Sequence, residues 1–216
     1  EIGGAEIFTD YHDLLSAKIV EAVLVCLPIH LNRQVSADCL GAGLHVLCEK
    51  PLAHTLEMAR ELAAISEESE AILMVGENYH YRDDFREAMN SIRSGHIGEI
   101  FLIQFNATSG VDHTRSYGAT VWRQTPAHRG GFVSDAGVHH AAALRLFGGE
   151  VAQVQAFARN VHPVIRAEDN LVASLHFASG ALGSYTATYT AVESEHLSHM
   201  RIFGTAGTID LGYGEL

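Results

Sequence analysis

The segment LHVLCEKPL, residues 44–52, decides the fold of this 216-residue chain. Its first five residues form a short apolar run after Gly43, which predicts a strand buried on both faces of a parallel sheet. Ligands of such sheets bind outside the carboxyl ends of the strands. Glu49 and Lys50 follow the strand directly, so we expect them at a ligand site, with Pro51 restricting the backbone behind them. A surface ion pair at a strand end is an equally good interpretation of this segment alone.

Strand and helix patterns alternate on both sides of this segment. Apolar runs predict strands at 5–10, 20–27 and 71–76, and helical periodicity predicts a helix at 33–42 and another that Thr55 caps. This alternation is typical of a doubly wound parallel sheet. The Gly-x-Gly-x-x-Gly motif of dinucleotide folds does not occur in the sequence. Either the fold binds no dinucleotide, or the chain lacks its first strand–helix–strand unit.

The pattern changes after Gly95, which ends a helix capped by Asp83 or Asp84. Strands and hairpins follow and predict an antiparallel sheet, so we place the domain boundary near residues 76–78. We therefore expect a partial Rossmann doubly wound parallel sheet in residues 1–77. An α+β domain with an open, mainly antiparallel sheet should follow in residues 78–216. Its predicted strands are 97–107, 151–158, 171–177, 181–189, 201–203 and 208–211.

Composition excludes several classes of partner. The net charge of −12 argues against nucleic acid and against anionic membrane surfaces, and no apolar run reaches the ~18 residues of a membrane helix. Cys26, Cys39 and Cys48 have no metal-type spacing and predict small buried side chains in a reducing, cytoplasmic setting. Fourteen histidines invite a metal hypothesis, but the sequence has no HExxH motif or Cys/His cluster, so we expect no metal site.

A second group of candidate residues lies between the predicted strands. Trp122-Arg123 is followed by Gly130-Gly131 and by a predicted helix at 136–147. Asp135 and His139 are four residues apart and therefore project from one helical face. A carboxylate beside an imidazole makes the imidazole a better base, which suits proton transfer near neutral pH. The alternative, which spacing alone favours, is that Asp135 caps the helix and His139 is a core residue.

Several short strings occur in an order that carries more information than any one of them. Taken together they resemble the glucose–fructose oxidoreductase / inositol dehydrogenase (Gfo/Idh/MocA) family, over essentially the whole chain. This resemblance favours the functional interpretation of Lys50, Asp135 and His139. The strings are Glu49-Lys50-Pro51, Gly76-Glu77-Asn78-Tyr79, Gly95-His96-Ile97-Gly98-Glu99-Ile100, Asp135-x-x-x-His139 and Gly204-Thr205-Ala206-Gly207-Thr208-Ile209.

The resemblance implies an N-terminal Rossmann domain that binds NAD or NADP. It also implies a C-terminal domain whose open sheet forms homodimers or homotetramers, and a small-molecule sugar or inositol-like polyol as substrate. In this family a lysine at the position of Lys50 hydrogen-bonds the reacting hydroxyl, and His139 would be the general acid/base. Asp135 would position His139 and the substrate. The residues implied at the cofactor are Pro28, Glu49, Lys50, Asn78, Trp122 and Arg123.

The sequence departs from the family pattern at several points. Leu27-Pro28-Ile29 replaces Thr-Pro-Asn, Asn32 replaces a histidine, and Ala142 replaces an aspartate. The glycine fingerprint is absent, and the end at Leu216 is early. We therefore expect a fragment that lacks the N-terminal glycine-rich unit and the C-terminal end, and that binds dinucleotide poorly by itself. Two other functions stay open: an NAD-dependent glycosidase on the same fold, and a non-catalytic protein that senses a sugar or a dinucleotide.

Overall fold

The computed structural model describes residues 4–127, 130–192 and 197–213. The chain forms two compact units, Glu1–Gly76 and Glu77–Leu216. Each unit has its own sheet and its own hydrophobic core.

The first unit is built on a three-stranded parallel sheet with the order β1-β2-β3. Helix α2 connects β1 to β2, and α3 connects β2 to β3, as in a doubly wound fold. The Thr55 hydroxyl accepts a hydrogen bond from the Met58 N–H at 3.2 Å, which confirms the predicted N-cap of α3. The elements are α1 (Tyr11–Ala17), β1 (Ala22–Val25), α2 (Ile29–Gly41), β2 (His45–Cys48), α3 (Leu56–Glu68) and β3 (Leu73–Val75).

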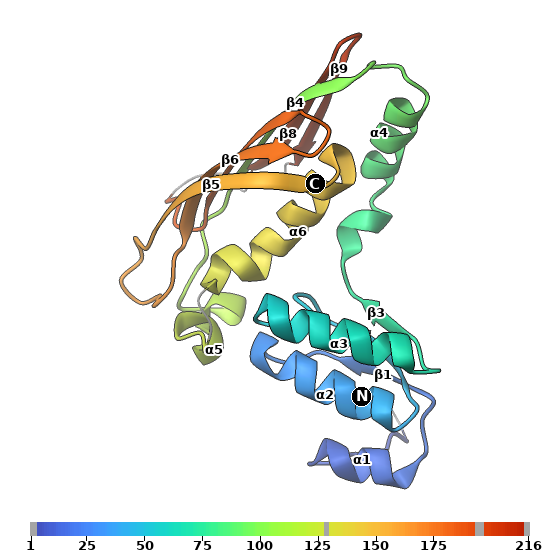
Figure 1. The fold of residues 1–216 in the computed structure, drawn as a ribbon. Coiled ribbons are helices and arrows are strands. Elements are labelled where there is room, and N and C mark those ends of the chain that lie inside the picture. The colour runs from blue at the N-terminus through green and yellow to red at the C-terminus, as the bar shows by residue number, and fades with distance from the viewer. Residues whose placement is uncertain (1–3, 128–129, 193–196, 214–216) are drawn as a thin grey trace. The chain divides into compact units, whose positions relative to one another are not determined.

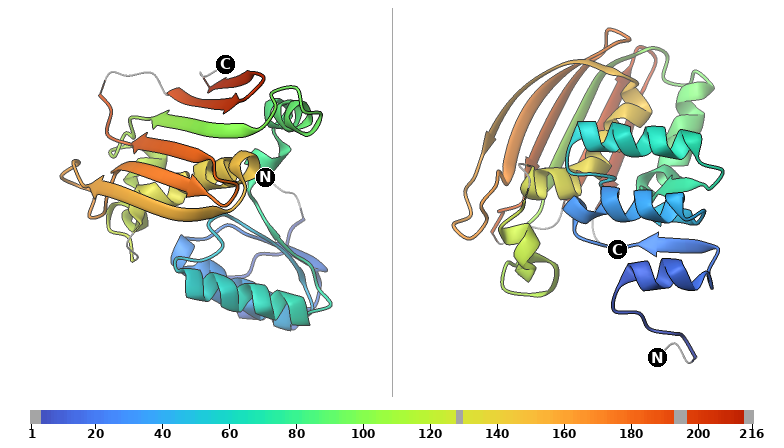
Figure 2. Two further views of the ribbon diagram at one scale, coloured as in Figure 1. Left: turned by 45° about the horizontal axis from the view of Figure 1, so that its top comes forward. Right: turned by 60° about the horizontal axis from the view of Figure 1, so that its bottom comes forward.

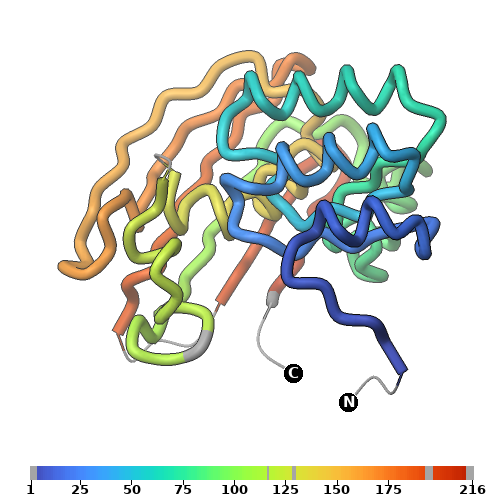
Figure 3. Tube along the Cα trace, turned by 90° about the horizontal axis from the view of Figure 1, so that it is seen from below, coloured from blue at the N-terminus to red at the C-terminus, as the bar shows by residue number. Residues whose placement is uncertain are grey.

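One face of this sheet carries the core of the first unit. Helices α2 and α3 lie side by side (Figure 3) and contribute Leu40 and Leu62 to a cluster with Val46. On the opposite face, Leu47 is 38% exposed. The prediction that the strand in residues 44–48 is buried on both faces is therefore wrong, because the described helices pack against one face.

The second unit is built on a six-stranded sheet with the order β5-β6-β7-β4-β8-β9 (Figures 1 and 2). Four of its pairings are antiparallel, and β4 pairs with β7 in parallel. The predicted open, mainly antiparallel sheet is confirmed. The elements are η1 (Asn78–Tyr81), α4 (Asp83–Arg93), β4 (Ile100–Thr108), η2 (Ser116–Ala119), α5 (Val121–Gln124), α6 (Gly131–Gly148), β5 (Val151–Arg159), β6 (Asn170–Phe177), β7 (Leu182–Thr188), β8 (Leu197–Gly204) and β9 (Thr208–Tyr213).

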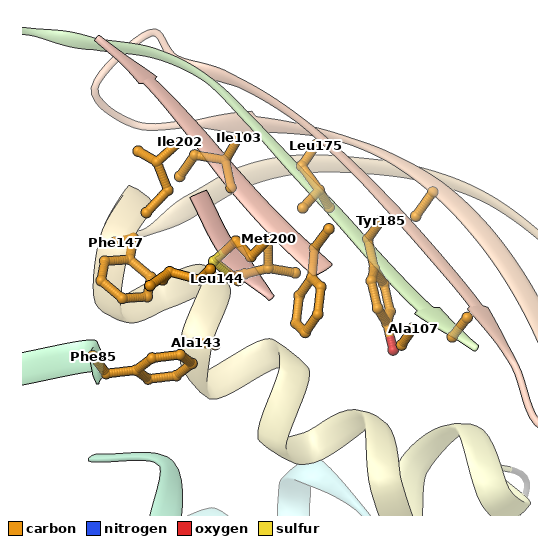
Figure 4. Close-up of a cluster of buried hydrophobic side chains, with 14 of the residues drawn as sticks. Phe85, Ile103, Ala107, Ala143, Leu144, Phe147, Leu175, Tyr185, Met200 and Ile202 are labelled. Carbon is orange, nitrogen blue, oxygen red and sulfur yellow. The ribbon is translucent and has the colours of Figure 1, made fainter. Parts of the chain in front are cut away.

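Helix α6 lies along one face of the six-stranded sheet, and the core of the second unit fills the space between them (Figure 4). Leu144 and Phe147 of the helix belong to the same buried cluster as Ile103, Tyr185 and Met200 of the strands. The apolar side of α6 is thereby fixed against the sheet, which holds the rest of the helix in place.

Helix α6 begins at Gly131, five residues before the predicted start at Ala136. Gly131 has a φ of +46°, and a Cβ there would lie 2.4 Å from Cβ of Ala167, so the position needs glycine. Asp135 consequently lies inside the helix, where it is buried. The alternative that Asp135 is the helix N-cap is therefore wrong.

Two details of the first unit differ from expectation. Residues 5–8 form no strand, and Cys26, placed in a buried strand by its apolar neighbours, is exposed one residue after β1. Cys39 and Cys48 are buried, and burial raises the pKa of both thiols, which keeps them protonated. None of the helices in the described ranges is long and apolar enough to cross a bilayer.

Candidate active site

Glu49 and Lys50 lie directly after β2, at the carboxyl end of the parallel sheet. The buried side-chain amide of Asn32 in α2 donates to the Glu49 carbonyl at 3.1 Å and to the Pro51 carbonyl at 2.9 Å. The Lys50 N–H donates to the Glu49 carboxylate at 3.1 Å, and the Lys50–Pro51 peptide bond is cis. Hydrogen bonds between side chains and the backbone therefore hold this segment in place, and two half-buried charged side chains lie at the strand end.

Asn32 was noted in the sequence only as a departure from the family pattern. Its position in the structure gives it a definite role, because it is fully buried and holds the loop that carries Lys50. The sequence signal that could have revealed this role is an amide, one turn before Ser36, on the side of α2 that also carries Cys39 and Leu40.

Pro28 lies between β1 and α2 and is the N-cap of that helix. It supplies no side-chain hydrogen bond. The Leu31 N–H donates to the Pro28 carbonyl at 2.8 Å, and the two N–H groups before it, of Ile29 and His30, have no side-chain cap at this helix end. Because β1 and β2 are parallel, this helix end and Glu49 lie at the same edge of the sheet. A helix N-terminus, a carboxylate and a lysine at the carboxyl end of a parallel sheet fit part of a nicotinamide dinucleotide.

In the second unit, His139 of α6 contacts a carboxylate that the i, i+4 spacing did not indicate. Its Nδ1 lies 2.7 Å from Oε1 of Glu77. Glu77 is buried, and the same Oε1 accepts the Tyr79 N–H at 3.0 Å. The Tyr79 ring stacks on the His139 ring with 4.9 Å between centroids and 21° between planes. An imidazole held by a carboxylate is a suitable general acid/base.

Asp135 lies one turn before His139 on α6 and belongs to a different set of contacts. It accepts a hydrogen bond from Nε of Arg123 at 2.7 Å and another from the Tyr117 hydroxyl. The side chains of Asp135 and Arg123 are 3% and 14% exposed, so this ion pair is largely shielded from water. Removing either partner would leave an uncompensated buried charge.

Aromatic rings enclose the guanidinium group of Arg123. Its central carbon lies 3.3 Å from the centroid of the Tyr117 ring and 3.9 Å from that of Trp122. Burial and the Asp135 charge raise the pKa of Tyr117, which keeps its hydroxyl protonated as a donor. The predicted pair Trp122-Arg123 is therefore joined to the predicted Asp135 in one cluster. Tyr117, which completes it, was not identified in the sequence because no local spacing connects it to α6.

His140 follows the predicted catalytic histidine but points into the core. Its Nδ1 lies 2.7 Å from the Tyr185 hydroxyl, and its ring meets Phe105 edge to face with 4.8 Å between centroids. Burial and, second, the neighbouring His139 lower the pKa of His140 to about 4, so it is neutral near pH 7. His140 is thus the core histidine of the pair, and His139, 19% exposed, is the one that a solute can reach.

The predicted site residues are divided between the two units. Pro28, Glu49 and Lys50 belong to the first unit. Within the second unit, Asp135 contacts Arg123, while Asn78 is exposed at the start of η1. In the described ranges, no three His, Cys, Asp or Glu side chains are gathered so that they could hold a metal ion.

Comparison with known proteins places both units in one family. Residues 2–77 match the family described as an oxidoreductase family with an NAD-binding Rossmann fold, and residues 85–210 match the GFO/IDH/MocA C-terminal domain. The chain is 30% identical over 215 residues to 1,5-anhydro-D-fructose reductase from Ensifer adhaerens. This alignment covers 97% of this chain and 62% of the reductase.

Solved structures agree with this assignment. An oxidoreductase from Thermotoga maritima superposes with a TM-score of 0.91 at 35% identity, covering 97% of this chain and 64% of that one. The WlbA dehydrogenase from Bordetella pertussis, solved with NADH and UDP-GlcNAcA, gives a TM-score of 0.90 at 26% identity, covering 97% of this chain and 60% of that one. The chain thus spans about three fifths of the length of these relatives.

A parallel sheet with crossover helices, followed by an open mixed sheet covered by the His139 helix, defines a Rossmann-type protein of two units. The chain belongs to the Gfo/Idh/MocA family of oxidoreductases. The resemblance seen in the sequence is thereby confirmed.

Proposed function

We propose that this chain is part of an NAD(P)-dependent oxidoreductase that transfers hydride between nicotinamide and a sugar or polyol hydroxyl. The observation that carries the proposal is the imidazole of His139, which is partly exposed and bound by a buried carboxylate. A sensing protein needs no such group, whereas oxidation of a hydroxyl requires a base for its proton.

The roles of the chain's own residues follow from their positions. His139 takes the hydroxyl proton during oxidation and returns it during reduction. Lys50, fixed at its strand end by the Asn32 contacts, hydrogen-bonds the reacting oxygen. Asp135 of α6 orients the substrate, and Arg123 balances the charge of Asp135. Asp135 was first expected to position His139 as well, and the contact between His139 and Glu77 suggests a different division of roles.

NAD or NADP supplies the two-electron chemistry when bound, as an acceptor or donor of hydride. Pro28, Glu49 and Lys50 would contribute the contacts of the first unit, at the N-terminus of α2 and the end of β2. Asn78 and Trp122 remain proposed contacts of the second unit. Arg123 would act mainly through Asp135, because its guanidinium group is already engaged there.

The relatives support a carbohydrate substrate. One is named as a reductase of 1,5-anhydro-D-fructose, and the WlbA structure contains a sugar nucleotide together with NADH. Hydroxyl-rich substrates have the groups that the proposed roles require, a carbon that carries both a C–H bond and a hydroxyl group. The class of sugar or polyol is therefore proposed, and the individual substrate is left to experiment.

The test uses the protein with its full reading frame. Nicotinamide reduction would be followed with NAD and with NADP against inositols, aldoses and sugar acids, for the parent and for Lys50→Ala. We expect turnover on at least one compound, reduced at least ~100-fold by the substitution. Equal turnover by the Lys50→Ala variant would contradict the assigned role of Lys50.

The same assay separates the two other functions. A glycosidase would release free sugar from a glycoside with no net change in cofactor absorbance. A sensor would bind NADH, give no turnover on any compound, and bind equally well after His139→Ala. Either result would replace the dehydrogenase proposal.

The proposal includes a homodimer or homotetramer in the cytoplasm. Phe157 and Val172 pair across β5 and β6 on the sheet face opposite the core, where they are 78% and 56% exposed, and Leu182 on the same face is 57% exposed. A second copy of the chain would cover this apolar surface.

Sedimentation velocity of the full protein should show a dimer or a larger oligomer, and the Phe157→Asp variant should sediment as a monomer. A monomeric parent would contradict this part.

A further inference from the structure

We propose that Glu77 is the positioning residue of His139. It keeps the imidazole proton on Nδ1, so that Nε2 is the atom that exchanges a proton with the substrate. The inference rests on the proposed function and deepens it. It assigns to Glu77 a role that the i, i+4 spacing had suggested for Asp135.

The polarity of the contact follows from the chemistry of the two groups. An ionised carboxylate accepts hydrogen bonds and donates none. The 2.7 Å contact between Oε1 of Glu77 and Nδ1 of His139 therefore requires a proton on Nδ1. In the neutral ring, the lone pair is then on Nε2. The tautomer is fixed before any substrate arrives, as a general base requires.

The carboxylate is itself held in one orientation. Glu77 precedes η1, and its Oε1 accepts the N–H of Tyr79 at 3.0 Å, which anchors the side chain to its own backbone turn. The Tyr79 ring then stacks on His139 at 4.9 Å and 21°. One short segment thus fixes the rotation of the imidazole through the hydrogen bond and its plane through the stacked ring.

The surroundings of Asp135 indicate a separate role for that carboxylate. Arg123 and Tyr117 both donate to Oδ2 of Asp135, and the guanidinium group balances its charge. Glu77 instead contacts the imidazole of His139 and the Tyr79 N–H, both through Oε1. Its carboxylate therefore faces the imidazole.

The proton and electron balance of the step gives this charge a function. During oxidation, the hydroxyl proton passes to Nε2 of His139. NAD or NADP, when bound, would accept the hydride from the same carbon, which leaves a carbonyl group. His139 then carries a proton on each nitrogen and a positive charge. The carboxylate of Glu77 already faces Nδ1, so it stabilises that charge as it develops, without reorganisation.

The experiment compares Glu77→Gln, Glu77→Asp and Asp135→Asn in the full-length protein, with histidine labelled with ¹⁵N. The amide of Glu77→Gln has the same shape but can donate as well as accept, so it no longer dictates the tautomer. The His139 signals, assigned with His139→Gln, report which nitrogen is protonated in the cofactor-free protein. The same variants are assayed for kcat and KM on whichever compound of the inositol, aldose and sugar-acid panel the parent turns over fastest.

We expect the parent and Asp135→Asn to show the proton on Nδ1, and Glu77→Gln to show a mixture of both tautomers. The kcat of Glu77→Gln should fall by about 10²- to 10⁴-fold, with KM changed less than about threefold. Glu77→Asp, which keeps the charge, should recover part of that loss. Unchanged signals of the other histidines would show that the fold is intact.

Two results would overturn the inference. One is a Glu77→Gln protein that keeps the parent tautomer and kcat. The other is a change of tautomer in Asp135→Asn but not in Glu77→Gln. A parent with the proton on Nδ1 but no turnover on any compound would contradict the proposed function while supporting the Glu77 assignment, so the two failures are distinguishable.

Discussion

The two units hold their candidate site residues by different means. In the first unit, the neutral amide of Asn32 binds the carbonyl groups of Glu49 and Pro51. In the second unit, charged side chains bind each other, as Arg123 binds Asp135. Neutral hydrogen bonds do not titrate near pH 7, whereas contacts of charged groups depend on protonation and are sensitive to loss of either partner. The second unit should therefore respond more strongly to acid and to single substitutions.

The largest expected effect is removal of the Asp135 carboxylate, which is buried in the second unit. Asp135→Ala leaves the guanidinium group of Arg123 buried without its counter-charge, which should lower the free energy of unfolding by about 3–5 kcal/mol. Denaturant unfolding, with hydrogen exchange read separately in residues 1–76 and 77–216, would measure the effect and locate it.

The matched control is Asp112→Ala, an exposed carboxylate of the same unit that accepts from Thr114. It should leave unfolding nearly unchanged. A loss below about 1 kcal/mol for Asp135→Ala would contradict the comparison, because it would mean that water screens the Arg123 pair. A double-mutant cycle with Arg123→Ala would give the coupling between the two side chains directly.

Acid should destabilise the second unit specifically. The pKa of His140 is about 4 in the folded protein against 6.5 for an ordinary histidine, so between these values the unfolded chain binds more protons. Stability is then fully present above pH 6.5 and falls as the pH decreases toward 4, by about 3 kcal/mol in total. Burial also lowers the pKa of His113, which acts in the same direction.

Hydrogen exchange at pH 7.0, 5.5 and 4.5 would test this prediction. Peptides from residues 77–216 should lose protection, and peptides from 1–76 should change little. His140→Gln should remove most of the pH dependence. Equal loss of protection in both units would show that the response comes from general charge repulsion and not from buried histidines.

The neutral contacts of the first unit give a smaller effect. Asn32→Ala removes the donor for two carbonyl groups and should lower the free energy of unfolding by about 2 kcal/mol. Gln34→Ala is the control on the same helix. Gln34 is exposed, and its described side-chain partners are Arg33 and Asp38 of the same helix. If both substitutions had equal effects, Asn32 would not be anchoring the loop that carries Lys50.

The smallest expected effect is at the start of α3. Thr55→Ala removes the acceptor for the Met58 N–H and should cost about 1 kcal/mol, whereas Thr55→Ser keeps the hydroxyl and should cost much less. Thermal unfolding of the two variants measures the difference. Unlike the loss in the second unit, this loss should be independent of pH between 4.5 and 7. A loss of stability that grows as the pH falls would contradict the interpretation of Thr55 as a neutral N-cap.

The sequence predicted most of the fold because the strands carry strong local patterns. The hairpin of β6 and β7 was placed within one or two residues, since alternation and a Ser-Gly turn fix both ends. The parallel pairing of β4 and β7 could not be predicted, because no local pattern specifies which distant strand is a neighbour. The low helix propensity of glycine argues against a helix that starts at Gly131. The early start of α6 depends instead on the close packing of Gly131 against Ala167.

The candidate site shows the same limit. The position of Lys50 followed from one strand and its end, which are local features. The contact between His139 and Glu77 joins residues 62 positions apart, so i, i+4 spacing pointed to Asp135 instead. Glu77 was part of a string that carried the family resemblance, yet its side-chain role depends on a fold that brings η1 against α6. Residue types were predicted more reliably than their partners.

The sheet order of the second unit has a consequence for synthesis on the ribosome. The strands of the first unit pair with partners close in the chain, such as Val23 with Val46. The central strand β4 must instead wait, because Leu102 pairs with Leu182 and Ile103 with Ile202. Until those segments emerge, the hydrogen-bonding edges of β4 have no sheet partner, and closing such long loops is entropically slow. A central strand of the sheet therefore stays unpaired while the later strands are synthesised, and a chaperone would be of most use in that interval.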